Sequence, residues 1–264
     1  MVGPTAGRAG STRPLSGVRD VRVRVRDGEH DGAGIAGPEE SWASVAVRIA
    51  EGLSPTAALH LWPHDLSGGT AHFVVDRDLV LDLRAMTRGD LPVLAEWLRA
   101  PHVRRWWHAD GEPTDARVAA RYGPRVDGDT PTRMWVVEVN GRSIGFVQDY
   151  RIRDYPDFAL LAPDPDALGL DYAIGDPHRV GRGLGVRVLW AWMLRARRDH
   201  PEVGSYFAAP DHRNLASLRI LAKAGFVQGT WFDEPQRDGT TATAVGCTLD
   251  VRRVLGPVPA ASGP

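Results

Sequence analysis

One glycine-rich segment, Gly175-Asp-Pro-His-Arg-Val-Gly-Arg-Gly-Leu-Gly185, constrains the fold of this chain more than any other feature. A strand-like stretch, residues 169–175, leads into it, and residues 184–198 have the length and apolar spacing of a helix. Between a strand and a helix, glycines let backbone N–H groups point at an anion, and the helix N-terminus adds a favourable partial charge. The segment therefore predicts a phosphate-binding turn.

The glycine pattern alone leaves other interpretations open. G-x-G-x-G also fits a plain flexible turn, and similar patterns occur in dinucleotide-binding folds. The residues after the predicted helix decide between these interpretations.

A second motif occupies residues 209–226, with the sequence APDHRNLASLRILAKAGF. It predicts a helix from Asn214 to Ala224 that Gly225 stops. The two motifs together resemble those of the GNAT acetyltransferases, in which (Q/R)-x-x-G-x-(G/A) precedes an N-x-x-(A/S) helix that ends in K-x-G-F. The matching residues are Val180, Gly183, Gly185, Asn214, Ser217, Lys223, Gly225 and Phe226. Val180 stands where the family usually has Arg or Gln.

The resemblance covers residues 79–252 and implies an α+β chain with the GNAT fold, in which helices flank a mixed, mostly antiparallel central sheet. The residues themselves predict the order β-α-α-β-β-β-α-β-α-β-β from residue 79 onward. The clearest local feature is a hairpin, because Asn140-Gly141 accepts the positive φ angles of a two-residue turn.

The chain before this domain has a different composition. Residues 1–40 are rich in Gly, Pro, Ser and Arg and predict a disordered tail, in which residues 21–26 alternate like a short edge strand or a solvated basic stretch. Residues 41–78 predict an extension that packs on the main domain, and residues 253–264 predict a loose C-terminal tail. The expected fold is α+β with a partly disordered N-terminal extension.

The family resemblance implies acetyl-CoA as the cosubstrate. Its pantetheine arm would lie between two splayed strands, residues 171–175 and 204–209, and its pyrophosphate would lie on the glycine turn. The cofactor-binding residues implied in this way are Ala173, Ile174, Gly181, Arg182, Gly183, Leu184, Gly185 and Asn214.

Within the family, the chain is similar to the aminoglycoside 6'-N-acetyltransferases. The residues that carry this likeness are Leu83-Arg84, Glu96-Trp97-Leu98, Trp106-Trp107, Ile144-Gly145, Gln148, Tyr150, Gly169-Leu-Asp171 and Gly181 to Gly185. A related branch acylates lysine or hydroxylysine during siderophore assembly and typically has His where this chain has Asp171. That difference favours the aminoglycoside branch.

Asp171 is the predicted catalytic residue. An amine must lose a proton before it attacks a thioester, and a carboxylate here could accept that proton through water or hold the substrate ammonium. The alternative is an edge-strand carboxylate that faces solvent. A bulge in the same strand would leave a backbone N–H for the developing oxyanion. Tyr172 should point to the opposite face, as packing or as a wall of the site.

The general acid has no obvious candidate in the sequence. Many GNAT enzymes place a Tyr four residues before the glycine of K-x-G-F, where it protonates the departing CoA thiolate. This chain has Leu221 at that position. The resemblance therefore leaves the proton donor unassigned.

Aromatic and acidic side chains suit a polycationic amino sugar as the acceptor. Trp106 and Trp107 end the first helical region, while Asp149 and Asp157 precede the catalytic strand. These four residues are the predicted substrate contacts. The Trp pair also fits a core role, and each aspartate also fits a solvated loop position.

Composition argues against several other classes. The chain has 32 Lys and Arg residues and 33 Asp and Glu residues, so it lacks the net positive charge that is typical of nucleic-acid-binding proteins. The lack of a long apolar run or signal core predicts no membrane span and a cytoplasmic protein. A lone cysteine, Cys247, does not allow an internal disulfide framework, and the scattered histidines lack metal-ligand spacing.

The family resemblance implies an N-acetyltransferase that moves an acetyl group from acetyl-CoA to a primary amine of an aminoglycoside or similar amino sugar. We expect it to be a monomer or a homodimer. Its role would be antibiotic resistance or self-protection. Leu221 and the N-terminal extension favour instead a siderophore-pathway lysine or hydroxylysine N-acyltransferase. A third interpretation is a non-catalytic acyl-CoA-binding module.

Overall fold

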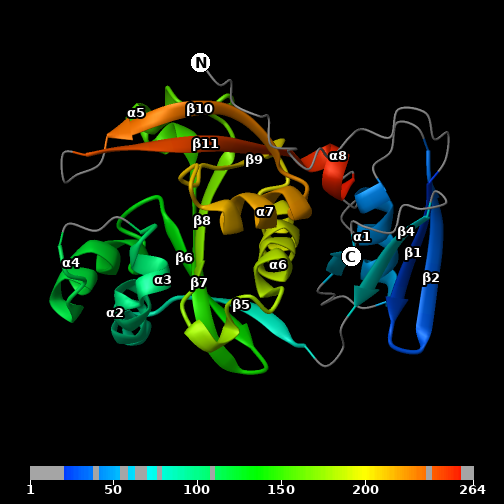
Figure 1. Ribbon diagram of the computed structural model, residues 1–264, viewed down its shortest axis with the longest axis horizontal. Helices are drawn as coiled ribbons and strands as arrows, with labels where there is room; N and C mark the ends of the chain where they lie inside the picture. Colours follow the sequence, from blue (N-terminus) through cyan, green and yellow to red (C-terminus); the bar gives the residue numbers. More distant parts are fainter. Residues whose placement is uncertain are drawn as a thin grey trace, which may run out of the picture.

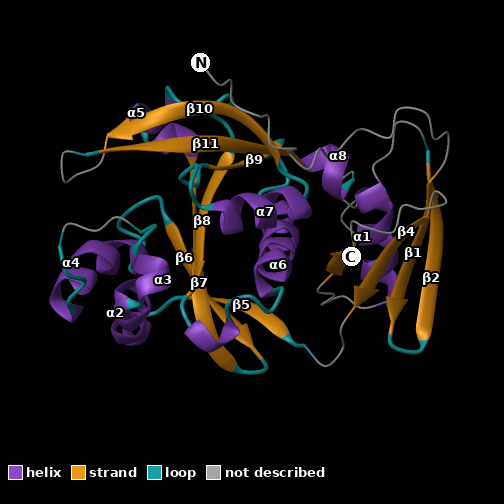
Figure 2. Ribbon diagram, viewed as in Figure 1, coloured by secondary structure: helices purple, strands orange, loops and turns teal. Residues whose placement is uncertain are grey.

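The computed structural model describes residues 21–37, 42–53, 59–62, 70–75, 79–107, 111–235 and 240–256. These residues form a seven-stranded and a four-stranded sheet with helices packed on both, as Figure 2 shows. None of the helices in these ranges combines the length and apolarity needed to cross a membrane.

The seven-stranded sheet is mixed and mostly antiparallel. Its strands are β5 (Leu81–Ala85), β6 (Arg133–Val139), β7 (Arg142–Arg151), β8 (Leu168–Ile174), β9 (Ser205–Ala208), β10 (Val227–Pro235) and β11 (Thr241–Asp250). They lie in the order β10-β11-β9-β8-β7-β6-β5, and only β8 and β9 run parallel. The α+β class and the mostly antiparallel central sheet are confirmed.

Helices cover both faces of this sheet (Figure 1). One face carries α2 (Leu91–Arg99), α3 (Pro101–Arg104) and α4 (Asp115–Val126), and the other carries α6 (Leu184–Asp199) and α7 (Leu215–Ala224). Shorter elements are η1 (Arg88–Asp90), η2 (Ile152–Asp154), α5 (Pro156–Ala159), η3 (Pro177–Arg179) and α8 (Val251–Leu255).

Alternation along β6 separates the two cores. Met134 and Val136 pack in the cluster formed with α2 and α4, whereas Trp135 and Val137 join the cluster around α6. Successive side chains of a strand point to opposite faces, so each strand serves both cores. The same alternation determines which side chains of β7 and β8 reach the site.

The predicted hairpin turn at Asn140-Gly141 and the predicted helix end at Gly225 are confirmed. Asn140 and Gly141 have φ angles of 52° and 71° between β6 and β7. Thr114 caps α4 by accepting a hydrogen bond from the backbone of Arg117 at 3.3 Å. Gly225 ends α7 with a φ angle of 104°.

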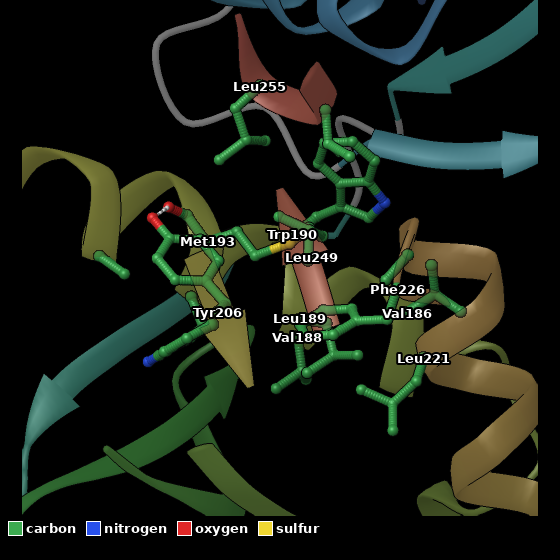
Figure 3. Packing of buried hydrophobic residues seen from close by; sticks show 14 of the residues in the cluster. Val186, Val188, Leu189, Trp190, Met193, Tyr206, Leu221, Phe226, Leu249 and Leu255 are labelled. Carbon is green, nitrogen blue, oxygen red and sulfur yellow. Dashed lines mark hydrogen bonds between the residues drawn. The ribbon is translucent and has the colours of Figure 1, made fainter. Parts of the chain in front are cut away.

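Helix α6 is the centre of the larger core, which Figure 3 shows from close by. Its side chains meet residues from β9, β11, α7 and α8 in one cluster that includes Leu189, Trp190, Met193, Tyr206, Leu221, Leu249 and Leu255. This packing on several sides fixes where the N-terminus of α6 lies.

The N-terminal sheet contradicts part of the predicted tail. Strands β1 (Val21–Asp27), β2 (His30–Ala36), β3 (Leu59–Trp62) and β4 (Thr70–Val75) form a sheet in the order β2-β1-β4-β3, covered by α1 (Trp42–Leu53). Strand β1 pairs on both sides, so it is not an edge strand.

The predicted disorder rested on the low apolar content of these residues. Residues 30–36 are ordered nevertheless, because their glycines let helix α1 pack closely on the sheet. The valines of β1 are buried, and a Cβ on Gly32 would lie only 2.1 Å from Ile49 of α1. Glycine in β2 thus lets the helix approach the sheet. The predicted tail is wrong for residues 21–36, while residues 1–20 and 38–41 lie outside the described residues.

A buried arginine joins this sheet's helix to the main domain. Arg197 of α6 donates to the carbonyl of Leu255 in α8 and to the carboxylate of Glu51 in α1, both at 2.6 Å. The predicted loose C-terminal tail is therefore wrong for the helical residues of α8, because Val254 and Leu255 are buried. Residues 257–264 lie outside the described residues.

Candidate active site

The central sheet opens between its two parallel strands. Strands β8 and β9 pair only at Leu168 with Tyr206 and at Gly169 with Phe207. Strand β7 continues to pair with β8 as far as Ile174. In the described sheet, residues 170–174 therefore have a strand partner on one side only, and their other edge faces a split.

A pocket occupies this split. It is lined by side chains from the end of the first helical region, from β8, from the second sequence motif and from β10, among them Trp106, Trp107, Asp171, Tyr172, Asn214 and Glu234. Neighbouring residues of a strand point to opposite faces, yet Asp171 and Tyr172 both line the pocket. The pocket therefore passes through the sheet, with Asp171 on the side of α4 and Tyr172 on the side of α7.

Asp171 is held by the strand beside it. Gln148 lies directly opposite on β7 and donates a hydrogen bond of 2.7 Å to the Asp171 carboxylate. Burial raises the pKa of Asp171, and Gln148, Arg125 and the Tyr150 hydroxyl each lower it. Burial and then the nearby Asp171 raise the pKa of Tyr150 well above its usual range. Asp171 is thus a desolvated carboxyl with three partners that favour its charged form.

The bulge predicted beside Asp171 is absent. The register between β7 and β8 runs without a shift from Gly145 and Ile174 to Arg151 and Leu168. The opening arises instead from the loss of pairing with β9. Backbone N–H groups on the unpaired edge of β8 are available to a ligand without any bulge.

The two tryptophans form one wall of the pocket. Trp107 donates from Nε1 to the Tyr122 hydroxyl at 2.7 Å, and its ring meets Phe146 edge-on at 4.7 Å between centroids. Arg105 lies over the ring of Trp106 at 5.8 Å. Both tryptophans are half-buried. The same side chains therefore pack against the core and line the pocket.

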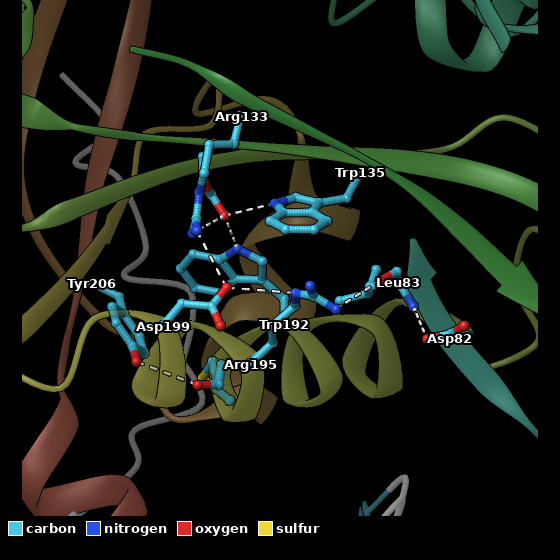
Figure 4. A network of polar contacts seen from close by, with 10 residues as sticks. Asp82, Leu83, Arg133, Trp135, Trp192, Arg195, Asp199 and Tyr206 are labelled. Atoms are coloured by element: carbon cyan, nitrogen blue, oxygen red, sulfur yellow. Dashed lines mark hydrogen bonds and ion pairs between the residues drawn. The ribbon is translucent and has the colours of Figure 1, made fainter. Parts of the chain in front are cut away.

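Asp149 does not face the pocket, and its prediction as a substrate contact is wrong. It follows Gln148 in β7, so its side chain points to the opposite face, where it is 1% exposed. It accepts hydrogen bonds from Arg133 at 2.7 Å, Trp135 at 2.8 Å and Trp192 at 2.9 Å. Figure 4 shows these three donors converging. Asp149 is an acceptor within the core.

Asp157 stays a prediction. Its backbone belongs to α5, and its side chain lies outside the described part of the structure.

The glycine turn has the geometry of an anion site. Gly181 and Gly183 have φ angles of 76° and 73°, and Gly183 is the N-cap of α6. The first turn of α6 carries no acidic side chain. Arg182 bonds back to the carbonyl of His178 at 2.8 Å, which closes the turn. Free N–H groups at this helix start suit a pyrophosphate.

Two other residues predicted for the cofactor serve packing at the same turn. Leu184 and Gly185 are buried, and a Cβ on Gly185 would lie 2.6 Å from Ile220 of α7. Glycine at this position lets α6 and α7 approach closely. The buried side chain of Leu184 and the close contact at Gly185 position the turn, so only the backbone N–H groups of these two residues remain for a ligand.

The remaining predicted cofactor residues lie along the split. Asn214 caps α7 by accepting from the Ser217 backbone at 3.1 Å, and it also lines the pocket. The carbonyl of Ile174 contacts His102 Nε2 at 2.9 Å, so that oxygen already has a partner. Ala173 packs against the cluster on the α2 and α4 face.

Tyr172, expected as packing or as a wall, lines the pocket, and its hydroxyl lies 2.9 Å from that of Ser217 on α7. Sequence reasoning missed two other pocket residues. Asp211 follows the second motif's proline, and its pKa is lowered chiefly by a hydrogen bond from Arg213 at 2.7 Å. Glu234 comes from β10, and no local pattern in the sequence singles it out.

Comparison with known proteins agrees with this geometry. A family model described as "Acetyltransferase (GNAT) domain" matches residues 87–234, more than half of the chain. The chain is 31% identical to an aminoglycoside N(6')-acetyltransferase type 1 of Klebsiella pneumoniae over 166 residues, or 62% of this chain and 78% of that protein. It is 29% identical to the lysine N-acyltransferase MbtK of Mycobacterium tuberculosis over 143 residues, or 54% of this chain and 67% of that protein.

A solved structure is similar over the same region. The aminoglycoside acetyltransferase AAC(6')-Ib, in complex with coenzyme A and kanamycin, superposes with a TM-score of 0.56 at 30% identity and covers 64% of this chain and 94% of that one. The chain therefore belongs to the GNAT acetyltransferase family and is an acetyl-CoA-dependent N-acyltransferase.

Proposed function

We propose that this enzyme transfers an acetyl group from acetyl-CoA to a primary amine of an aminoglycoside or a similar amino sugar. The observation that carries the proposal is the pocket, which brings the carboxyl of Asp171 together with Glu234 and the Trp106-Trp107 wall at the open edge of β8. Carboxylates and aromatic faces suit an acceptor that carries several ammonium groups. Relatives named for this activity support the assignment.

In this proposal, different residues along the split bind different parts of the cosubstrate. The N–H groups at Gly181 to Gly185 hold the pyrophosphate, and the open edge of β8 holds the pantetheine arm. Bound acetyl-CoA supplies a thioester carbonyl that an amine can attack. An N–H on the same edge then stabilises the charge that develops on that oxygen.

Asp171 acts on the acceptor amine. The amine nitrogen forms a bond to the acetyl carbon, its proton passes to Asp171 directly or through water, and the C–S bond breaks. This role requires Asp171 to be ionised before the reaction. Gln148, Arg125 and Tyr150 favour that charged form against the effect of burial.

Tyr172 is the proposed proton donor to the departing thiolate. Leu221, which replaces the usual Tyr, is 1% exposed and packs in the core. Ser217 precedes Leu221 by four residues, so both lie on the same face of α7. The Tyr172 hydroxyl reaches Ser217 from β8, and burial raises its pKa, so it keeps its proton at neutral pH.

A second candidate function is acylation of a lysine or hydroxylysine side chain in siderophore assembly. Leu221 and the similarity to a lysine N-acyltransferase favour it. A non-catalytic acyl-CoA-binding module is the remaining alternative.

The deciding experiment measures thiol release from acetyl-CoA with the purified full chain against kanamycin-type aminoglycosides and lysine-like amines. Turnover only with sugars that carry a 6'-amine supports the proposal, and turnover only with hydroxylysine moves the enzyme to the second candidate. Tight CoA binding without turnover on either set supports the non-catalytic module. A raised inhibitory concentration of the best substrate, in a susceptible host that expresses the chain, would support a resistance role in the cytoplasm.

A further inference from the structure

Asp171 is the end of a hydrogen-bonded relay that begins on another element. Arg125, near the end of α4, donates from Nη1 to Oε1 of Gln148 at 2.5 Å. Gln148 donates from Nε2 to Oδ2 of Asp171 at 2.7 Å. Gln148 is only 8% exposed, so little of its amide is open to water.

The relay has a fixed direction. A guanidinium carries donors only, so the side of the Gln148 amide that faces Arg125 must be its oxygen. The amide nitrogen must then face Asp171. A donor aimed at the carboxyl requires that carboxyl to accept, and an ionised carboxylate accepts best. Arg125 therefore controls Asp171 through the orientation of one amide, as well as by its charge.

Arg125 is itself held in place. Its guanidinium lies over the ring of Tyr122 at 5.0 Å from the centroid, and the Tyr122 hydroxyl accepts from Trp107 at 2.7 Å. The aromatic wall of the pocket and the relay thus share one support on α4. A displacement of that wall would also displace the group that orients Asp171.

We propose that Arg125 and Gln148 are positioning residues that keep Asp171 ionised and aimed at the acceptor amine. The inference rests on the proposed function, in which Asp171 is the proton acceptor. It adds two residues, from α4 and β7, that do not need to touch either substrate.

The other charged or titratable groups around Asp171 come from three elements. Tyr150 of β7 donates to the carboxyl, and Glu234 of β10 lines the same pocket, where its charge raises the pKa of Tyr150. Asp211, on the loop after β9, also lines the pocket, but Arg213 neutralises it. Arg125 is the cation whose charge lowers the pKa of Asp171.

The test compares Arg125→Gln with the wild type in two measurements. The kcat/KM for the best acceptor, followed against pH, should fall about tenfold on the acidic limb and approach the wild-type value as pH rises, because Asp171 ionises at higher pH without the guanidinium. Carbon-detected NMR of the carboxyl groups, assigned with Asp171→Asn, should show the Asp171 midpoint moved to higher pH.

Matched variants separate positioning from general damage. Arg125→Lys keeps the charge and should stay closer to the wild-type midpoint, whereas Gln148→Leu, which removes the donor, should shift the midpoint upward as Arg125→Gln does. Arg117→Gln removes an exposed arginine from the same helix and should leave the midpoint unchanged. An unmoved Asp171 midpoint in folded Arg125→Gln and Gln148→Leu would overturn the relay.

The two measurements also separate the inference from the proposed function. If the wild type acetylates no amine, the proposed function fails. The NMR midpoints still decide the relay, since they need neither acetyl-CoA nor an acceptor.

Discussion

The hydroxyl of Tyr172 lies 2.9 Å from the hydroxyl of Ser217 and joins strand β8 to helix α7 across the split. The contact puts a partly buried phenol beside the helix face on which the family usually carries its proton donor and this chain carries Leu221. A hydroxyl from β8 thus lies next to that helix face, although it comes from a different element.

Replacement of Tyr172 by Phe tests the proton-donor role. We expect kcat to fall about tenfold or more with the KM for acetyl-CoA little changed, since a general acid acts mainly in the transition state. Ser217→Ala keeps the phenol and should lose much less. Steady-state kinetics at saturating acceptor measure both, and wild-type kcat in the Phe variant would refute the role.

Asp171→Asn should lower kcat/KM by at least about tenfold because an amide cannot accept the amine proton. Acetyl-CoA affinity, measured by calorimetry, should be preserved, since the side chain acts on the acceptor. Turnover of Asp171→Asn at the wild-type rate would remove Asp171 from the mechanism.

The same substitution should leave the protein at least as stable as the wild type at neutral and alkaline pH. Burial raises the pKa of Asp171 in the folded state, so the folded state binds this proton more tightly than the unfolded state, and stability falls as pH rises through the folded pKa. Asn removes that dependence. Urea unfolding at pH 5 and pH 8 should show a smaller difference for Asp171→Asn than for the wild type, and equal pH dependence would contradict the expected sign.

Gly183→Val should weaken acetyl-CoA binding about tenfold or more. Gly183 has a φ angle of 73° at the start of α6, where a β-branched residue is strained and blocks backbone approach to an anion. Gly141→Val, at a φ angle of 71° in the hairpin turn, is the matched control for strain alone. It should lower the Tm without changing CoA affinity, and equal affinity in both variants would show that the turn does not hold the cosubstrate.

Asp149→Asn should lower the free energy of unfolding by about 3 kcal/mol, because it removes the buried charge that Arg133 and two indole N–H groups share. Asp154→Asn, an exposed change in η2, should stay within about 0.5 kcal/mol of the wild type. Both are measured by urea unfolding. A large loss of acceptor affinity with unchanged stability in Asp149→Asn would restore its predicted substrate role.

The sequence alone determined the main domain because its signals are local. Asn140-Gly141 requires a tight turn, Gly225 ends a helix, and the glycines before α6 create a helix start open to an anion. The family motifs then placed Asp171 and Asn214 in one site, and the structure brings both into one pocket.

Only the tertiary structure decided which face of the sheet each neighbouring residue serves and what it meets there. Gln148 and Asp149 are adjacent in sequence, yet one orients Asp171 and the other closes a core network, because alternation separates them and the helices that cover the two faces come from distant segments. Glu234 and Arg125 come from β10 and α4, which are distant in sequence from β8, and no local sequence pattern singles them out. The N-terminal sheet depended likewise on a contact between Gly32 and Ile49, and the close approach of a helix to a glycine strand is a property of packing that composition does not encode.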